Sequence, residues 1–285
     1  MTPFGTRLRA ATDTFGPLCA GLDPHRGLVE AWGLDYSVAG LERFAMTCVD
    51  AFAGHVGVVK PQSAFFEVFG SAGVAVLERV VADLRAAGTL VVVDAKRGDI
   101  GSTMQAYADA YLADGSPLAG DALTVSPYLG YGALRPALDL AAATGRGLFV
   151  LALTSNPEGP AVQHARLDES GSVAGSVVAG AAADNADAVA RGELGHVGLV
   201  VGATVGSAVQ DLGLDLAAAG TPILAPGFGA QGGSLDSVRR VFGPALPQVL
   251  ASSSRDVLSA GPDVAALRER AVATAEALRE AVASG

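Results

Sequence analysis

The chain has 285 residues, of which half are hydrophobic and 17% are charged, so it can bury a large core and is too apolar for extended disorder. Its formal net charge of −10 repels nucleic acid and anionic membranes, so any phosphate-bearing ligand needs a local basic pocket. Two cysteines, Cys19 and Cys48, and the lack of a signal-peptide or membrane-spanning apolar run predict a cytoplasmic protein.

The first part of the chain alternates amphipathic helices with short apolar strands. A short opening helix that closes the bottom of the fold is predicted by residues at helical spacing, Phe4, Leu8 and Ala11. The run LCAGLDP predicts a strand ending at Asp23, although Asp23 can instead cap the following turn. A helix capped by Ser37 and stopped by Gly54 then leads to a second strand, which ends on Lys60.

The third strand carries the densest group of charges. After a capped helix over 71–88, the segment LVVVDAKRGDIGST (90–103) is apolar until its C-terminal end. Side chains alternate along a strand with period two, so Asp94 and Lys96 enter the same space. Gly98 allows a sharp turn that can bring Asp99 back toward the Lys96 ammonium. A lysine between two carboxylates is predicted, and the alternative reading of these residues alone is a surface salt-bridge cluster.

Five further apolar runs predict strands, and each becomes polar only at its C-terminal end: ALTVSPYLG, GLFVLALTSNP, HVGLVVGAT, TPILAPGFG and PQVLASSS. Between the second and third of them lies an enlarged loop at about 156–180, which is a candidate lid with a predicted hairpin around 169–171. The last predicted helix covers 264–282.

These eight strands, most of them separated by helices and without a linker, predict a TIM (β/α)8 barrel of the α/β class that forms a single domain over 1–285. The alternative is a doubly wound open sheet. Such a sheet normally has a glycine-rich dinucleotide turn after its first strand, and residues 21–24 (GLDP) are not such a turn.

The loops after the seventh and eighth strands predict a phosphate site. Barrels commonly bind phosphate there through backbone amides and a helix N-terminus. The loop PGFGAQGG (226–233) offers glycines for close approach and the Gln231 amide as a donor. The eighth strand ends with three hydroxyls and a fork-shaped cation suited to phosphate, from Ser252, Ser253, Ser254 and Arg255.

The string DAKRGDIGST (94–103) resembles the motif of orotidine 5′-monophosphate decarboxylases, in which D-x-K-x-x-D is followed by Ile and, three residues later, Thr. The resemblance extends along most of the chain through GLDP, VVKP, LTSN and PGFGAQGG. It implies a homodimeric barrel that binds a nucleotide at its top face. Two departures are Ser254 in place of the more widespread Gly before Arg255, and the long segment after Asn156; both look like a longer bacterial branch of the family.

The resemblance also implies a role for each matched residue. Four residues form the charged network at the reacting centre and the ribose: Asp23, Lys60, Asp94 and Lys96. Three residues reach the neighbouring subunit's site: Asp99, which also belongs to the network's core, Ile100 and Thr103. The substrate's base and phosphate are held by the remaining six: Thr154, Ser155, Gln231, Gly232, Ser254 and Arg255.

Under this reading Lys96 stabilises the carbanion left by loss of CO2 and protonates it, so we expect no cofactor and no metal. None of the four histidines has metal-ligand spacing. One rival is a Mg-dependent sugar-phosphate decarboxylase or aldolase on the same barrel, which would depend on metal. A second rival is a non-catalytic nucleotide-binding barrel, which would not need Asp94, Lys96 and Asp99 together.

Overall fold

A computed structural model of the chain describes residues 2–167, 171–228 and 235–283. Eight parallel strands close into a barrel in the order β1-β10-β9-β8-β5-β4-β3-β2, so the first strand pairs with both the second and the last. The barrel strands are β1 (Leu18–Leu22), β2 (Val58–Pro61), β3 (Leu90–Arg97), β4 (Ala122–Val125), β5 (Gly147–Leu153), β8 (Val197–Val201), β9 (Ile223–Pro226) and β10 (Val249–Ser253). They are the eight predicted strands, and the predicted TIM barrel is confirmed.

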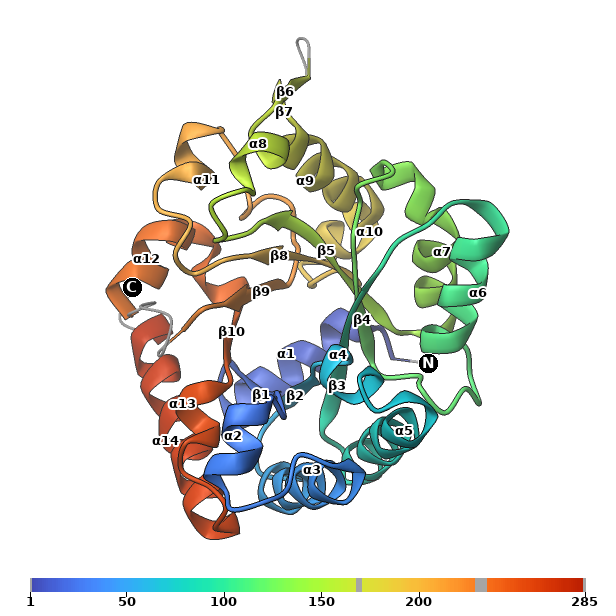
Figure 1. Cartoon of the computed structure of the whole chain (residues 1–285). Coiled ribbons are helices and arrows are strands. Elements are labelled where there is room, and N and C mark those ends of the chain that lie inside the picture. The colour runs from blue at the N-terminus through green and yellow to red at the C-terminus, as the bar shows by residue number, and fades with distance from the viewer. Residues whose placement is uncertain (1, 168–170, 229–234, 284–285) are drawn as a thin grey trace.

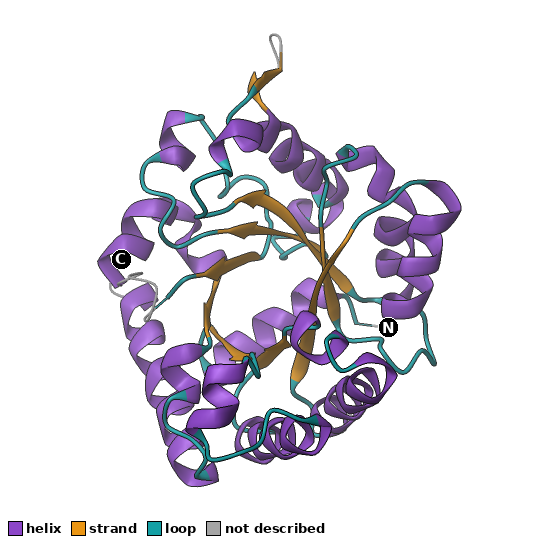
Figure 2. Ribbon diagram, in the orientation of Figure 1, coloured by secondary structure: helices purple, strands orange, loops and turns teal. Residues whose placement is uncertain are grey.

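Helices form a ring around the barrel, which Figure 2 shows as orange strands enclosed by purple helices. At least one helix follows each barrel strand. In chain order these are α2 (Arg26–Ala31), α3 (Val38–Phe52), α4 (Ala64–Glu67), α5 (Gly70–Ala86), α6 (Gly101–Leu112), α7 (Arg135–Thr144), α8 (Pro160–Gln163), α9 (Val173–Asp184), α10 (Ala186–Ala190), α11 (Ala208–Asp211), α12 (Leu235–Phe242), α13 (Arg255–Leu258) and α14 (Val264–Ala283).

Helix α1 (Phe4–Phe15) lies across the N-terminal end of the barrel, as predicted (Figure 1). Its residues Phe4 and Leu8 are buried among the side chains that fill the barrel interior, including Phe149 and Leu250. The rings of Phe4 and Phe149 meet edge to face with centroids 5.9 Å apart. The helix therefore closes the bottom of the barrel with apolar side chains.

The barrel interior changes from apolar to charged along each of two neighbouring strands. On β2, Val58 belongs to the interior apolar cluster, and Lys60 follows two residues later on the same face. On β3, Val92 lies in that cluster and Asp94 follows in the same way. The charged side chains thus rest on an apolar floor at the C-terminal end of the strands, which is where barrel enzymes carry their sites.

One helix cap follows the prediction and one does not. The Ser37 hydroxyl accepts a hydrogen bond from the Gly40 amide and caps α3, as predicted. The helix predicted to be capped over 71–88 instead begins at Gly70, whose φ of +63° lets the chain turn directly out of α4, and no side chain caps it.

The predicted hairpin forms in part. The short strands β6 (Arg166–Leu167) and β7 (Gly171–Ser172) pair antiparallel and project from the barrel (Figure 1). Residues 168–170, which include Glu169 of the predicted turn, lie outside the described residues.

Replacing Phe4 by Ala tests the closure of the barrel by α1. We expect the free energy of unfolding, measured by urea denaturation, to fall by about 3 to 5 kcal/mol because the substitution leaves a cavity in the core. Asp13→Ala on the exposed face of the same helix should change it by less than about 0.5 kcal/mol. Equal losses for the two variants would contradict this packing.

Candidate active site

The C-terminal ends of β1, β2 and β3 bring four predicted charged residues together. The Lys60 ammonium lies 2.8 Å from Asp94 Oδ2 and 3.9 Å from Asp23 Oδ1. The Lys96 ammonium lies 2.6 Å from the other Asp94 oxygen. The side chains of Asp23, Lys60, Asp94 and Lys96 therefore form a row in which negative and positive charges alternate.

Both members of the central pair are buried: Lys60 is 6% exposed and Asp94 is 8% exposed. Burial acts to raise the pKa of Asp94, but the charges of Lys60 and Lys96 and their hydrogen bonds outweigh it and hold that pKa well below its usual range. Burial acts to lower the pKa of Lys60, and the charges of Asp94 and Asp23 outweigh it and raise that pKa above its ordinary value. Both groups therefore stay charged at neutral pH.

Two neutral side chains that the sequence analysis missed complete the hydrogen bonds of Asp94. The Thr124 hydroxyl donates to Asp94 Oδ1 at 2.8 Å and accepts from the Lys96 backbone N–H at 2.9 Å. The Gln62 amide nitrogen, with the amide turned so that it donates, lies 2.9 Å from Asp94 Oδ2. Their only sequence signals are a hydroxyl within the apolar run ALTV and an amide directly after VVKP.

The backbone at Lys96 is strained. Its φ of +47° makes it the sole non-glycine residue with a positive φ in the described part of the chain. The pairing of β3 with β4 also shifts register between Val93 and Arg97. Such strain concentrates at functional positions, where neighbouring contacts hold it. Here the hydrogen bond from the Lys96 N–H to Thr124 holds the turn, and the Lys96 side chain remains 44% exposed at the mouth of the barrel.

Asp99 does not turn back to Lys96 within the chain, so that expectation was wrong. Its carboxylate accepts a hydrogen bond from the adjacent Ile100 N–H at 2.8 Å, because the chain enters α6 at this point. No ion pair joins Asp99 to Lys96 within the residues that the structure describes. Ile100 is 61% exposed and Thr103 is also exposed, so both side chains of this turn are open to solvent in the single chain.

A cavity of about 330 Å³ opens beside the charged row. Arg255 and Ser254 line it at the end of β10, together with Asp23 and Lys60. Gly21 makes room for Ser254, because a Cβ built at position 21 overlaps the Ser254 hydroxyl. Pro226, Gly227 and Phe228 of the predicted phosphate loop and Ser252 of β10 also line it. The two remaining lining residues, His25 and Phe65, were not predicted from the sequence. Gln231 and Gly232 lie in 229–234, outside the described residues.

The end of β5 carries Thr154 and Ser155. The Gln163 amide accepts from the Thr154 N–H at 2.9 Å and donates to the Thr154 hydroxyl at 2.7 Å. Ser155 is exposed, and its backbone lies against Gly202, where a Cβ would be 3.3 Å from the Ser155 nitrogen. Gln163 belongs to the enlarged segment and was missed by the sequence analysis.

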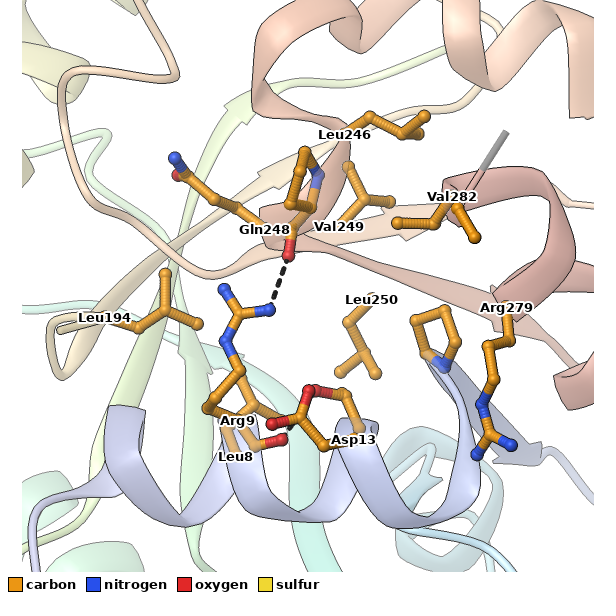
Figure 3. Close-up of a pocket in the computed structure, with 14 residues that line it drawn as sticks. Leu8, Arg9, Asp13, Leu194, Leu246, Gln248, Val249, Leu250, Arg279 and Val282 are labelled. Atoms are coloured by element: carbon orange, nitrogen blue, oxygen red, sulfur yellow. Dashed lines mark hydrogen bonds between the residues drawn. The ribbon is translucent and has the colours of Figure 1, made fainter. Parts of the chain in front are cut away.

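A second cavity, of about 270 Å³, lies at the opposite end of the barrel between α1 and the start of β10 (Figure 3). Leu8, Leu250 and Val282 give it an apolar lining. Arg9 donates to the Pro247 carbonyl at 3.0 Å there. It contains none of the charged row, and the candidate site is therefore assigned to the C-terminal end.

The described residues contain no group of three or more His, Cys, Asp or Glu side chains arranged to hold a metal ion. Within the same described ranges, no helix combines the length and hydropathy needed to span a membrane.

Fold and site together define a class: a (β/α)8-barrel enzyme that carries an alternating row of carboxylates and ammonium groups beside an arginine-lined cavity. A family model described as Orotidine 5'-phosphate decarboxylase / HUMPS family matches residues 16–270. The chain belongs to this family.

Relatives named orotidine 5'-phosphate decarboxylase match nearly the whole chain. The one from Salinispora arenicola is 60% identical over 271 residues, which is 95% of each chain. The one from Streptomyces coelicolor is 58% identical over 283 residues, which is 99% of each chain. A crystal structure from Streptomyces avermitilis has a TM-score of 0.94 at 57% identity and covers 99% of this chain and 97% of that one. The family expected from the sequence is confirmed, and the doubly wound sheet is excluded.

Replacing Lys60 by Met tests the buried pair. Asp94 then loses its buried ion pair and keeps the more exposed one with Lys96, so we expect the free energy of unfolding at pH 7 to fall by about 3 kcal/mol, the low end for breaking a buried ion pair. The pKa of Asp94 in the folded variant rises relative to the parent. As pH falls through that raised pKa, the folded variant binds a proton before the folded parent does, and the deficit shrinks.

Urea denaturation over a pH series measures this deficit. Arg26→Met, which removes an exposed ion pair with Glu30 on α2, is the control and should cost less than about 1 kcal/mol at every pH. A deficit for Lys60→Met that grew toward acid pH would have the wrong sign for this account.

Proposed function

We propose that the chain decarboxylates orotidine 5′-monophosphate to uridine 5′-monophosphate and CO2, the last step of de novo pyrimidine nucleotide synthesis. The observation that carries the proposal is the exposed Lys96 ammonium held 2.6 Å from buried Asp94, beside the cavity of Arg255, in a chain of this family. The curated relatives carry the name of the same activity.

Lys96 has the chemistry that this reaction needs. Loss of CO2 from C6 of the orotate ring leaves a carbanion that no adjacent carbonyl delocalises, so a nearby cation and early protonation must stabilise it. As an ammonium, Lys96 supplies both the charge and the proton. The proposed reaction uses no electron sink, and we propose no cofactor.

In the proposed mechanism Asp94 acts on the substrate carboxylate, and four other residues bind the phosphate. The low pKa of Asp94 keeps it ionised, and in the proposed complex it lies against the substrate carboxylate, a like-charge contact that is relieved when CO2 leaves. Arg255, Ser254, Gln231 and Gly232 hold the phosphate far from C6. Their binding energy serves to close the loops and exclude water, so a truncated nucleoside should lose turnover as well as affinity.

The remaining contacts follow the position of each residue. Asp23 and Lys60, which line the cavity, bind the ribose, and Thr154 and Ser155 at the end of β5 bind the pyrimidine.

A Mg-dependent sugar-phosphate enzyme is the rival on the same barrel. The names of the curated relatives favour the decarboxylase. We also propose a cytoplasmic location, since Cys19 and Cys48 are both free and buried.

The direct test of function is an assay with purified protein. Loss of the orotate absorbance on mixing with orotidine 5′-monophosphate shows the reaction. Activity should survive exhaustive chelation, because Lys96 rather than a metal ion is the proposed stabiliser. Loss of activity with EDTA and its recovery with Mg²⁺ would assign the chain to the sugar-phosphate rival.

Two substitutions separate chemistry from binding. Lys96→Ala should lower kcat by several orders of magnitude while uridine 5′-monophosphate still binds, because the phosphate contacts remain. Arg255→Ala should weaken phosphate-bearing ligands by about 2 to 4 kcal/mol, the scale for losing one partner of a buried charge pair. Calorimetric titration and the absorbance assay measure the two effects. Substantial turnover by Lys96→Ala would refute its role as proton donor.

We further propose a homodimer with shared active sites. Large hydrophobic side chains are exposed on the connections after three neighbouring strands, β2, β3 and β4: Val68, Ile100, Tyr128 and Leu129. Exposed apolar groups of this kind favour a protein contact. Asp99 and Thr103 lie on the same connection as Ile100, and Thr103 is also exposed. In a two-fold dimer these residues reach the partner's site.

Mixing two inactive variants tests shared sites. In the dimer proposed here, a mixed dimer of Lys96→Ala and Asp99→Asn has one site with both lesions and one with neither. Random exchange makes about half of the dimers mixed, so activity should return to roughly a quarter of the parent's. If Asp99 serves its own barrel, every site keeps one lesion and mixing restores nothing. Absence of recovery despite demonstrated subunit exchange would therefore exclude shared sites.

A further inference from the structure

The enlarged segment after β5 folds back onto the end of that strand through one side chain. Gln163, the last residue of α8, makes two hydrogen bonds to Thr154: its amide oxygen accepts from the N–H at 2.9 Å, and its amide nitrogen donates to the hydroxyl at 2.7 Å. An amide that engages the backbone and the side chain of one residue fixes both its position and its rotamer.

These bonds leave the Thr154 hydroxyl without a proton for a ligand. The hydroxyl donates its only hydrogen to Asn156 Oδ1 at 2.6 Å, and the Asn156 amide in turn donates to Glu158 at 2.9 Å. The N–H of Thr154 is also occupied by Gln163. Of the two residues assigned above to the pyrimidine, Thr154 therefore acts indirectly, as an internal anchor, and Ser155 is the one whose exposed side chain is available to the substrate.

The Ser155 backbone also lies against Gly202, the residue that follows β8. The Gly202 N–H donates to the Leu153 carbonyl at 2.9 Å, and a Cβ on Gly202 would lie 3.3 Å from the Ser155 nitrogen. Position 202 thus has little room for a side chain next to this turn. The Ser155 backbone is confined between the end of β8 and the Thr154 anchor.

We infer that Gln163 is a positioning residue for Ser155: its two hydrogen bonds to Thr154 set the turn that presents Ser155 to the pyrimidine, and they make the enlarged segment part of base recognition. The inference rests on the proposed function, because Ser155 is assigned there to the substrate's base. Gln163 itself touches Thr154 and needs no contact with the substrate.

The substitution Gln163→Met tests it, since Met has a similar length and forms neither hydrogen bond. We expect kcat/KM for orotidine 5′-monophosphate to fall roughly 10- to 100-fold, the scale for a misplaced binding group. Inhibition by ribose 5-phosphate, which lacks the base, should stay within about twofold, because that ligand uses the Arg255 cavity. Val162→Ala, an exposed neighbour on the same helix, is the matched control and should behave as the parent.

A double-mutant cycle distinguishes positioning from a general structural role. If Gln163 acts through Ser155, Ser155→Ala with Gln163→Met should be no worse than Ser155→Ala alone, within about twofold. Gln163→Glu keeps an acceptor for the Thr154 N–H but loses the donor, and should recover part of the activity. Multiplying losses in the double variant, or an equal loss of ribose 5-phosphate affinity, would overturn the inference.

The outcomes also separate this inference from the proposed function. A parent protein that fails to consume orotidine 5′-monophosphate refutes the function. An active parent with impaired Ser155→Ala and unimpaired Gln163→Met refutes only the positioning role. An unimpaired Ser155→Ala refutes the role of Ser155 and with it the inference, and leaves the decarboxylation standing.

Discussion

A carboxylate that is nine-tenths buried needs a partner for each of its oxygens, because an uncompensated charge in the protein interior costs several kcal/mol. Asp94 has Lys60 and Gln62 at one oxygen and Lys96 and Thr124 at the other. These partners come from β2, β3, β4 and the turn after β2, so the carboxylate is satisfied only when three neighbouring strands end at matching heights. The barrel thereby fixes the place of the Lys96 ammonium before any ligand arrives.

Much of this arrangement can be predicted from the sequence, because it depends on the periodicity of the apolar residues and on the charged residues at the C-terminal ends of the strands. An apolar run followed by a charge locates each strand exit, and the closure of eight strands then gathers Asp23, Lys60 and Asp94 without further information. The cap at Ser37 and the helix that closes the bottom of the barrel have equally local signals. In these places local preference and tertiary structure agree.

The parts of the site that were not predicted from the sequence depend on contacts between residues that are distant along the chain. Thr124 is 30 residues from Asp94, and a hydroxyl in an apolar strand has no charge to draw attention to it. Gln163 lies in the long segment after Asn156, where the chain departs from the family motifs on which the sequence prediction rested. The direction of Asp99 depends on how the chain enters α6, and glycines on both sides allow more than one turn. In each case the missing information is a tertiary contact.

The Ser254 hydroxyl, on the residue that follows β10, fills the space that a side chain at position 21 of β1 would need. Position 21 therefore cannot accept a side chain while Ser254 is present. A side chain larger than hydrogen can enter position 21 only after residue 254 has lost its own, so the mutational path between a Gly-Arg and a Ser-Arg end of the eighth strand has a required order. A side chain at position 21 that fits when residue 254 is Gly should disrupt the cavity beside Arg255 when residue 254 is Ser, so the two positions should show strong epistasis.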